Sequence, residues 1–239
     1  MISVKLACTS WAFERTFQSG DLTQLEFLDS AARELGCDGV VLDDRHFPRY
    51  DDDYLAQVRK MATDLGLTIA ALASDTFFTA DREVMRAAVE RAETLGAPLL
   101  AGRLGTETAL AWSEQLGKLG AAAGLAKAAN VTLALRNAPG TFAATTHDCK
   151  RVTKEADSAW LRYGLEPGAF DAASDPLALQ AKTVLLWSDA QQLPDVARWE
   201  GYCGFVALDR DAGDASIPEM RDAMRRWRIA RAEFELNRT

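Results

Sequence analysis

The sequence predicts a single-domain (βα)8 barrel spanning residues 1–239, and three observations support this fold class. Helix-like segments alternate with short apolar runs, and a Gly or Asn stop separates the two. Gly36, Gly66 and Gly96 are evenly spaced, at a distance that suits parallel strands joined by crossover helices. Eight strand-like runs occur without a dividing linker. A doubly wound open sheet is the alternative, but no G-x-G-x-x-G motif follows the first run and no Walker-type loop occurs.

The first half of the chain shows this repeat most regularly. Apolar residues at three- and four-residue steps predict helices near 22–36, 53–65, 82–95 and 107–129. Each helix is expected to stop at Gly36, Gly66, Gly96 or Asn130, because Gly and Asn readily adopt the left-handed conformation that ends helices. Short apolar runs predict strands at 4–8, 39–42, 67–72, 98–101 and 131–135.

The second half continues the pattern less regularly. Strands are expected at 161–165, 183–187 and 204–208, each followed by a polar residue. A helix is expected around His147. A final helix over 217–236 carries Met220, Met224 and Trp227 near one side and is expected to close the chain.

Composition and charge favour a small-molecule ligand. The chain has 27 Lys+Arg against 35 Asp+Glu, a net charge of −8, which would repel nucleic acid or an anionic membrane. No basic leader and no apolar run of about eighteen residues occurs, so the protein is expected to be neither exported nor membrane-spanning. The four cysteines form no C-x-x-C pair or disulfide framework, which is typical of a cytoplasmic protein.

Polar residues follow every predicted strand. The active site of such a barrel lies at the C-terminal ends of its strands, so these residues are expected to converge on one rim. The strand 131–135 is notable because it runs directly into Arg136, a cation after a buried run. The pattern predicts a polar ligand pocket. Its residues come from Ser10-Trp11, Asp43-Asp44-Arg45-His46, Ser74-Asp75, Arg103, Arg136-Asn137, Glu166, Ser188-Asp189 and Asp209.

Individual candidates differ in the chemistry that they offer. His46 titrates near neutral pH and could move a proton if Asp43 or Asp44 orients it; alternatively, it is a loop histidine packed by Phe47 and Pro48. Arg103 could bind an acid or phosphate group, or pair with Asp75. The remaining substrate-binding candidates are Arg136, Asn137, Asp43 and Trp11, of which Trp11 could form an apolar platform for a sugar ring.

Several stretches resemble one known family. Residues 7–13, 35–42, 65–72 and 131–141 are similar to segments of the xylose isomerase-like barrels, the group of sugar-phosphate isomerases, epimerases and endonuclease IV. The resemblance covers most of the chain. It implies a divalent metal held by acids at the ends of strands five, six and eight and by a histidine on strand seven. It also implies proton transfer on a sugar through a metal-stabilised enediolate.

The chain departs from that metal-binding pattern. Arg136 stands at the strand-five Glu position, Glu166 replaces the strand-six Asp, and Asp209 replaces the strand-eight Glu. The strand-seven His falls on Leu186, and a Glu common on strand two falls on Val41. A fixed guanidinium would repel a cation, so we predict no metal and no other cofactor. We hypothesise that Arg136 takes the place of the metal and pairs with Glu166, Asp209 or both.

Two functions follow from the resemblance. The first is an isomerase or epimerase of a small sugar-like compound, with Glu166, Asp209 and His46 as acid/base candidates and Arg136 as an electrophilic clamp. The alternative is a non-catalytic binding or regulatory protein that keeps the barrel and its pocket. A nuclease is disfavoured, because the nucleases of this group need several metal-ligating histidines and the chain has 2.

Overall fold

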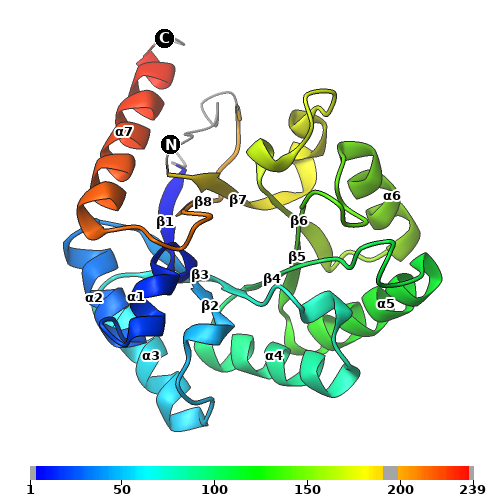
Figure 1. Cartoon of the computed structure of the whole chain (residues 1–239), viewed down its shortest axis with the longest axis horizontal. Helices are drawn as coiled ribbons and strands as arrows, with labels where there is room; N and C mark the ends of the chain where they lie inside the picture. The colour runs from blue at the N-terminus through cyan, green and yellow to red at the C-terminus, as the bar shows by residue number, and fades with distance from the viewer. Residues whose placement is uncertain (1–3, 191–198, 237–239) are drawn as a thin grey trace.

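The computed structural model describes residues 4–190 and 199–236. Its strands are all parallel and close into a barrel in sequence order, with β1 paired to both β2 and β8 (Figure 1). This confirms the predicted fold class, and every predicted strand overlaps its observed counterpart. The strands are β1 (Lys5–Thr9), β2 (Gly39–Asp43), β3 (Thr68–Ala73), β4 (Leu99–Arg103), β5 (Thr132–Arg136), β6 (Leu161–Leu165), β7 (Thr183–Asp189) and β8 (Phe205–Asp209).

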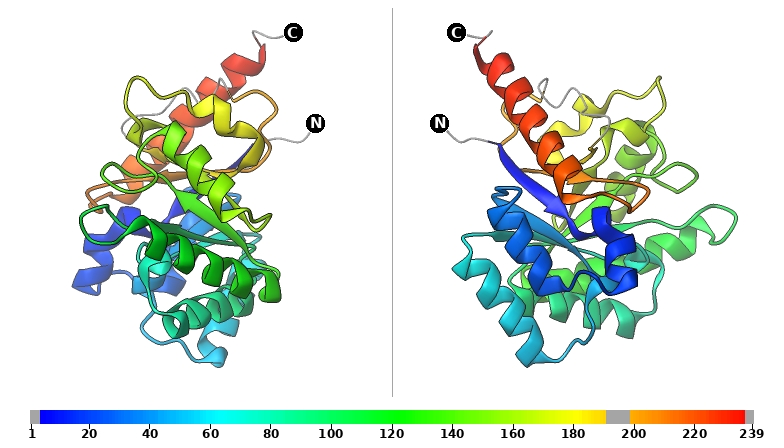
Figure 2. Two further views of the ribbon diagram at one scale, coloured as in Figure 1. Left: turned by 90° about the vertical axis from the view of Figure 1, so that its right-hand side faces the viewer. Right: turned by 60° about the vertical axis from the view of Figure 1, so that its left-hand side comes forward.

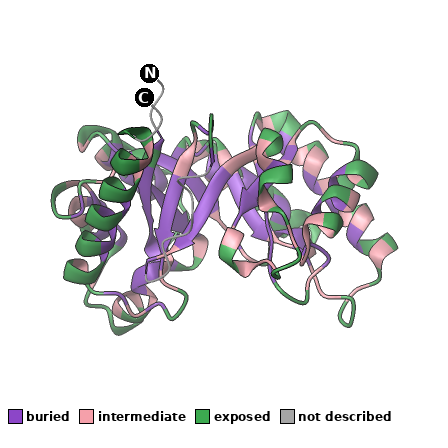
Figure 3. Cartoon of the chain, turned by 90° about the horizontal axis from the view of Figure 1, so that it is seen from above, coloured by how far each residue is buried: buried purple, intermediate pink, exposed green. Residues whose placement is uncertain are grey.

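Helices surround the barrel and expose their outer faces, while the strands at the centre are buried (Figure 3). The helix stops are confirmed: Gly36, Gly66, Gly96 and Asn130 have φ of 62°, 73°, 70° and 55°. The last helix, α7, lies on the side of the barrel where β1 and β8 meet (Figure 2). The helices are α1 (Glu14–Ser19), α2 (Gln24–Arg33), α3 (Asp52–Asp64), α4 (Arg82–Leu95), α5 (Trp112–Ala129), α6 (Thr146–Ala156) and α7 (Ile217–Leu236).

Two helical features differ from the prediction. The short helix α1 was not predicted, and α5 begins at Trp112 rather than near residue 107. Gly105, before α5, makes two hydrogen bonds to residues outside its own segment. Its amide donates to Gln115 Oε1 at 2.8 Å, and its carbonyl accepts from the Phe142 amide at 3.0 Å. The residues between Gly105 and α5 form a turn, in which the Ala109 and Leu110 amides both donate to the Thr106 carbonyl at 3.1 Å, so α5 begins only at Trp112.

The connection between β6 and β7 also departs from a regular βα unit. Residues 166–182 contain no α-helix; the 3₁₀ turns Pro167–Ala169 and Pro176–Lys182 lie there instead. Each turn begins with a proline, which has no backbone N–H to donate and suits the first position of a helical turn. Only Leu179 of the second turn is buried, so the segment lacks the apolar face that would hold a longer helix.

Alanines make up most of the buried cluster inside the barrel, and Trp187 is its largest member. Trp187 on β7 is 1% exposed and packs among alanines. Space for its ring comes partly from Gly164 on β6, where an added Cβ would lie 2.5 Å from Trp187 Cζ3. Trp187 therefore forms part of the floor beneath the C-terminal ends of the strands. The alanines are Ala7, Ala70, Ala71, Ala101, Ala134 and Ala207.

Within the described part of the chain, no helix is long and apolar enough to cross a membrane. Cys8, Cys37, Cys149 and Cys203 are all free thiols, which confirms that they form no disulfide framework.

Candidate functional site

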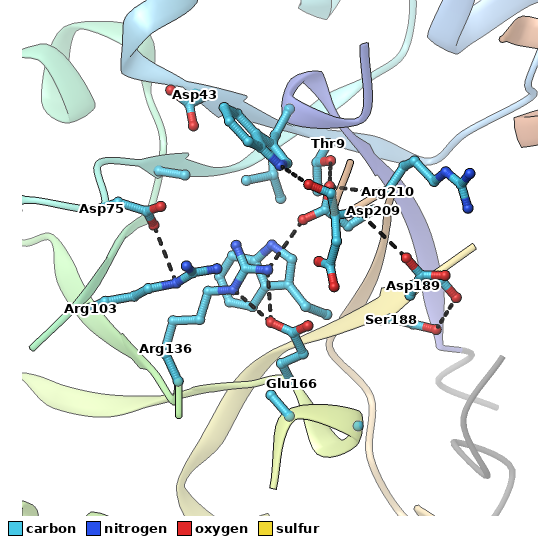
Figure 4. A pocket seen from close by; sticks show the side chains of 18 of the residues that line it. Thr9, Asp43, Asp75, Arg103, Arg136, Glu166, Ser188, Asp189, Asp209 and Arg210 are labelled. Atoms are coloured by element: carbon cyan, nitrogen blue, oxygen red, sulfur yellow. Dashed lines mark hydrogen bonds and ion pairs between the residues drawn. The ribbon is translucent and has the colours of Figure 1, made fainter. Parts of the chain in front are cut away.

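A cavity of about 680 Å³ opens at the C-terminal ends of the strands. Residues at or just beyond the end of every strand line it, as the strand-end pattern predicts (Figure 4). Its charged lining is mixed, with more acids than arginines. The acids are Asp43, Asp75, Glu166, Asp189, Asp209 and Asp211, and the arginines are Arg45, Arg103, Arg136 and Arg210.

Arg136 lies at the centre of this cavity, at the last position of β5. Its Nε and Nη2 donate to Glu166 Oε2 at 3.1 and 2.8 Å, and Nη2 also lies 3.3 Å from Asp209 Oδ2. The predicted pairing with both acids is therefore present. Nη1 makes no hydrogen bond to any residue that the structure describes.

Arg136 is 6% exposed, yet its surroundings keep it charged. Burial opposes the charge, but Asp209 and Glu166 outweigh it and raise the pKa of the guanidinium. The guanidinium carbon also lies 4.9 Å from the ring centre of Trp187, a cation–π contact. The side chain is thus held by two carboxylates and one indole.

Asp209 is fully engaged by protein donors. Its Oδ1 accepts from the Thr9 hydroxyl at 2.6 Å and from the Arg210 amide at 2.8 Å, while Oδ2 faces Arg136. The residue is 2% exposed. This geometry fits a residue that positions Arg136 better than one that exchanges protons with a ligand.

Glu166 differs from Asp209 in having an available oxygen. Both bonds from Arg136 reach Oε2, and Oε1 accepts no hydrogen bond within the described residues. Asn137 fixes the backbone beneath it: Asn137 Nδ2 donates to the Glu166 carbonyl at 3.0 Å, and the Glu166 amide donates to Asn137 Oδ1 at 2.7 Å. Asn137 borders the cavity, but its amide group is used to position Glu166.

Arg103 and Asp75 lie on the side of the cavity next to β3 and β4. Arg103 Nε is 3.6 Å from Asp75 Oδ1, so the pairing considered from the sequence is present as a long ion pair. β4 and β5 are paired in register at Arg103 and Arg136, which places the two cations on neighbouring strands.

Asp43, Arg45 and Trp11 form the adjoining rim. Arg45 Nε and Nη2 donate to the two Asp43 oxygens at 2.8 and 2.7 Å. The Arg45 guanidinium carbon also lies 4.3 Å from the Trp11 ring centre, so one face of the expected sugar platform is covered. Trp11 Nε1 donates to the Asp211 carbonyl at 3.4 Å.

His46 does not have the surroundings that the sequence suggested. Its Nδ1 lies 2.8 Å from Ser10 Oγ, its Nε2 contacts Glu14 Oε2, and its ring stacks on Phe17 with centroids 4.1 Å apart. The expected orientation by Asp43 or Asp44 is wrong, because Asp43 is bound by Arg45 and Asp44 faces Arg91 at 3.8 Å. His46 is also absent from the lining of the cavity. The unpredicted helix α1 supplies both Glu14 and Phe17, so sequence spacing could not reveal these contacts.

Sequence reasoning missed several lining residues, among them Thr9, Trp187, Arg210 and Asp211. Thr9 and Trp187 are ordinary strand residues in sequence, and only barrel closure brings them to Asp209 and Arg136. Asp211 lies two residues after Asp209, the acid that ends β8, and this closeness to a strand end could have identified it as a site candidate. Burial, with Glu166 and Asp189 nearby, raises the pKa of the Asp211 carboxyl.

The donor set at the centre does not fit a divalent metal. In the part of the chain that the structure describes, no group of three His, Cys, Asp or Glu side chains could hold an ion. The two acids expected to remain from a family metal site, Glu166 and Asp209, have the Arg136 guanidinium between them. A cation placed there would be repelled by that charge.

Comparisons with solved structures find the same fold across nearly the whole chain. A protein of Sinorhizobium meliloti 1021 has 14% identity and a TM-score of 0.77, with 95% of this chain and 98% of that chain covered. An L-ribulose 3-epimerase has 15% identity and a TM-score of 0.76, with coverages of 98% and 97%. The IolI protein, described with a bound zinc atom, has 14% identity and a TM-score of 0.75, with coverages of 97% and 99%.

A search of curated proteins finds no match. The model of one protein family matches residues 30–192, which include β2 to β7 and the Arg136–Glu166 pair. The chain therefore belongs to the family described as xylose isomerase-like TIM barrel.

Proposed function

We propose that this protein binds a small sugar-like polyhydroxy compound in the cavity and isomerises or epimerises it without a divalent metal. The supporting observation is the arrangement of Arg136 and Glu166. Arg136 is held between two acids with Nη1 free, and Glu166 keeps Oε1 free beside it. An electrophile and a proton acceptor are thus adjacent at the base of a cavity that a sugar would fit.

These two groups suit proton transfer next to a carbonyl. For isomerisation, Glu166 would take the proton from the carbon beside the substrate carbonyl and return it to the carbonyl carbon, while a second proton moves from the neighbouring hydroxyl to the carbonyl oxygen. For epimerisation, the same carbon would have to receive a proton on its opposite face, from a second acid or from water. Negative charge would then develop on the substrate oxygen, and Arg136 would donate to it from Nη1. Asp209 and Trp187 would hold the guanidinium in place, so that little reorganisation accompanies the reaction.

The proposal assigns to Arg136 the charge that a metal supplies in relatives. A guanidinium is permanently protonated and offers directed donors, although it is a weaker electrophile than a divalent ion. The epimerase among the structural neighbours supports this class of reaction through a shared fold. The fold alone does not determine the chemistry, so the test must address the site.

A non-catalytic binding protein is the second candidate, and one observation favours it. Both oxygens of Asp209 are occupied by Thr9, Arg210 and Arg136, which leaves fewer free acids than the sequence suggested. A binder needs only complementary donors and acceptors, and the cavity provides those without further change.

Solvent deuterium exchange separates the two candidates. Metal-stripped protein is incubated in D₂O with a panel of ketoses and aldoses, and incorporation at carbon is followed by NMR. We expect exchange with at least one sugar, unchanged by added Mn²⁺ or by EDTA, and abolished in Glu166→Gln. Exchange that appears only with added metal would falsify the metal-free mechanism. Sugar binding without exchange would favour the binding protein.

A further inference from the structure

We propose that the ligand of this cavity is a polyhydroxy monocarboxylate, a sugar acid, whose carboxylate binds Arg103. The inference rests on the proposed function, since it names the substrate class of the same site. Two observations support it: the four lining arginines differ in how many hydrogen bonds they make to protein acids, and they lie at different places around the cavity.

None of the side-chain donors of Arg103 is bonded to a described residue, whereas each of the other three lining arginines uses some of its donors. Arg136 is bound by Glu166 and Asp209, and the other two arginines have close partners: Arg45 donates to Asp43 at 2.7 Å, and Arg210 Nε donates to Asp214 at 3.0 Å. Arg103 makes no side-chain hydrogen bond to any described residue, and its buried Nε is unsatisfied. Its nearest acid, Asp75, is 3.6 Å away, beyond hydrogen-bond distance.

The position of Arg103 makes these donors accessible to a ligand. It ends β4 and lines the cavity, and its side chain is 34% exposed. An arginine fork of this kind matches a carboxylate, which can accept two parallel N–H bonds. The Arg103 Nε is buried beside Asp75, so the carboxylate would bind the two accessible Nη atoms at the end of the guanidinium.

The opposite side of the cavity suits hydroxyl groups. Figure 4 shows Arg103 and Asp75 on one side of Arg136, and Asp189 and Asp209 on the other. Asp211 also lines the cavity, and its carboxyl interacts with those of Glu166 and Asp189. Because both oxygens of Asp209 are occupied, sugar hydroxyls on this side would donate to Asp211 and to Glu166 Oε1, so a ligand with one acidic end and a hydroxylated chain matches both sides.

The overall charge of the lining favours a carboxylate over a phosphate. The acids of the lining outnumber its arginines, so a doubly charged phosphate would meet more repulsion than a singly charged acid. A neutral sugar could offer Arg103 only uncharged hydroxyl acceptors, which bind a guanidinium less strongly than a carboxylate does. A monocarboxylate satisfies Arg103 at the smallest electrostatic cost.

The test measures binding by isothermal titration calorimetry with three sets of probes. The first set is the four- to six-carbon aldonates and uronates, the second is the neutral polyols and sugars with the same carbon skeletons, and the third is the phosphate esters of these neutral compounds. We expect at least one acid to bind tenfold or more tightly than its neutral counterpart. Arg103→Met should abolish that preference while it preserves neutral-sugar binding. Arg86→Met is the matched control: Arg86 pairs with Glu83 on α4, does not line the cavity, and its loss should change acid affinity by less than about threefold.

Asp75→Asn provides a second test, because its expected effect would not occur if Arg103 had only a structural role. Removing the competing carboxylate should tighten binding of the acid by about two- to fivefold and leave the neutral compound unaffected. A preference for phosphate esters, or an acid preference that survives in Arg103→Met, would overturn the assignment. Neutral sugars that bind as well as acids refute the inference but support the proposed function. Failure of all three sets to bind refutes the proposed function itself.

Discussion

Arg136 carries a charge where burial alone would oppose it. Glu166 and Asp209 balance that charge, and the same three side chains form the base of the cavity. Removing one member of such a group is costly, because the remaining charges stay buried without compensation. At the scale of single residues, the site and the stability of the fold therefore depend on the same contacts.

Arg136→Met should lower the free energy of unfolding by about 3–5 kcal/mol, because Glu166 and Asp209 would face each other without a cation. Urea unfolding followed by circular dichroism measures this loss. Arg33→Met is the matched control: Arg33 pairs with Asp29 on the exposed face of α2, and its loss should cost less than about 0.5 kcal/mol. Equal losses in the two variants would show that the central ion pairs contribute no special stability.

Asp211 gives the site a dependence on pH. Burial, then Glu166 and Asp189, raise the pKa of its carboxyl, so the folded state retains this proton to a higher pH than the unfolded chain does. The free energy of unfolding therefore falls as the pH rises from the pKa of Asp211 in the unfolded chain to its higher pKa in the folded protein. Asp211→Asn should raise Tm by about 1 °C at pH 7 and leave it unchanged at pH 3.

A neighbouring acid supplies a control of opposite sign. The hydrogen bond from Arg210 lowers the pKa of Asp214, so ionised Asp214 contributes stability above its unfolded pKa. Asp214→Asn should lower Tm at pH 7, and the difference from the unsubstituted protein should shrink as the pH falls through the lowered pKa of Asp214. If Asp211→Asn also lowered Tm at pH 7, the conclusion that ionised Asp211 destabilises the folded protein would be wrong.

At the scale of elements, Asn137 connects the ends of β5 and β6. Its amide group both donates to and accepts from the backbone of Glu166, which fixes the start of the β6–β7 connection. This connection lacks an α-helix, so its first residues depend on such side-chain bonds. Asn137 consequently positions a candidate catalytic group.

Asn137→Ala should cost about 1–3 kcal/mol of stability, since the part-buried Glu166 amide loses its acceptor and the Glu166 carbonyl keeps only the Ala169 amide as donor. Hydrogen exchange monitored by NMR should show lost protection of the Glu166 amide. Thr145→Ala, which removes the N-cap of α6, should destabilise by about 1 kcal/mol but leave that amide protected. Unchanged protection of Glu166 in Asn137→Ala would contradict the positioning role.

The sequence was most informative where structure is local. Apolar periodicity and the stops at Gly36, Gly66 and Gly96 predicted the strands and the principal helices, because both depend on neighbours in the chain. The Arg136 pairing was also predictable, since barrel closure brings strand ends together. The surroundings of His46 were not, because they depend on α1, a short helix with no buried residue and hence no apolar pattern.

At the scale of the whole molecule, the packing of the barrel interior reaches the functional site. Trp187 crosses an alanine-rich interior and supports Arg136 from below. Gly164 lies against this indole, so the absence of a side chain there determines where the ring and the guanidinium can lie. A change inside the barrel should therefore alter the cavity above it, because close-packed interiors transmit strain.

Gly164→Ala tests this connection. The added methyl group would meet Trp187 Cζ3 at 2.5 Å and Ala134 Cβ at 3.2 Å, so the indole must shift or the strands must separate. We expect a loss of about 1–3 kcal/mol of stability, together with a changed near-ultraviolet circular dichroism spectrum as Trp187 moves. Gly120→Ala is the control: Gly120 lies in α5 with nothing within 4 Å of an added Cβ, and alanine there should increase stability by up to about 1 kcal/mol. A Gly164→Ala protein with unaltered stability and spectrum would show that the interior can absorb the methyl group, and that Trp187 does not couple the barrel core to Arg136.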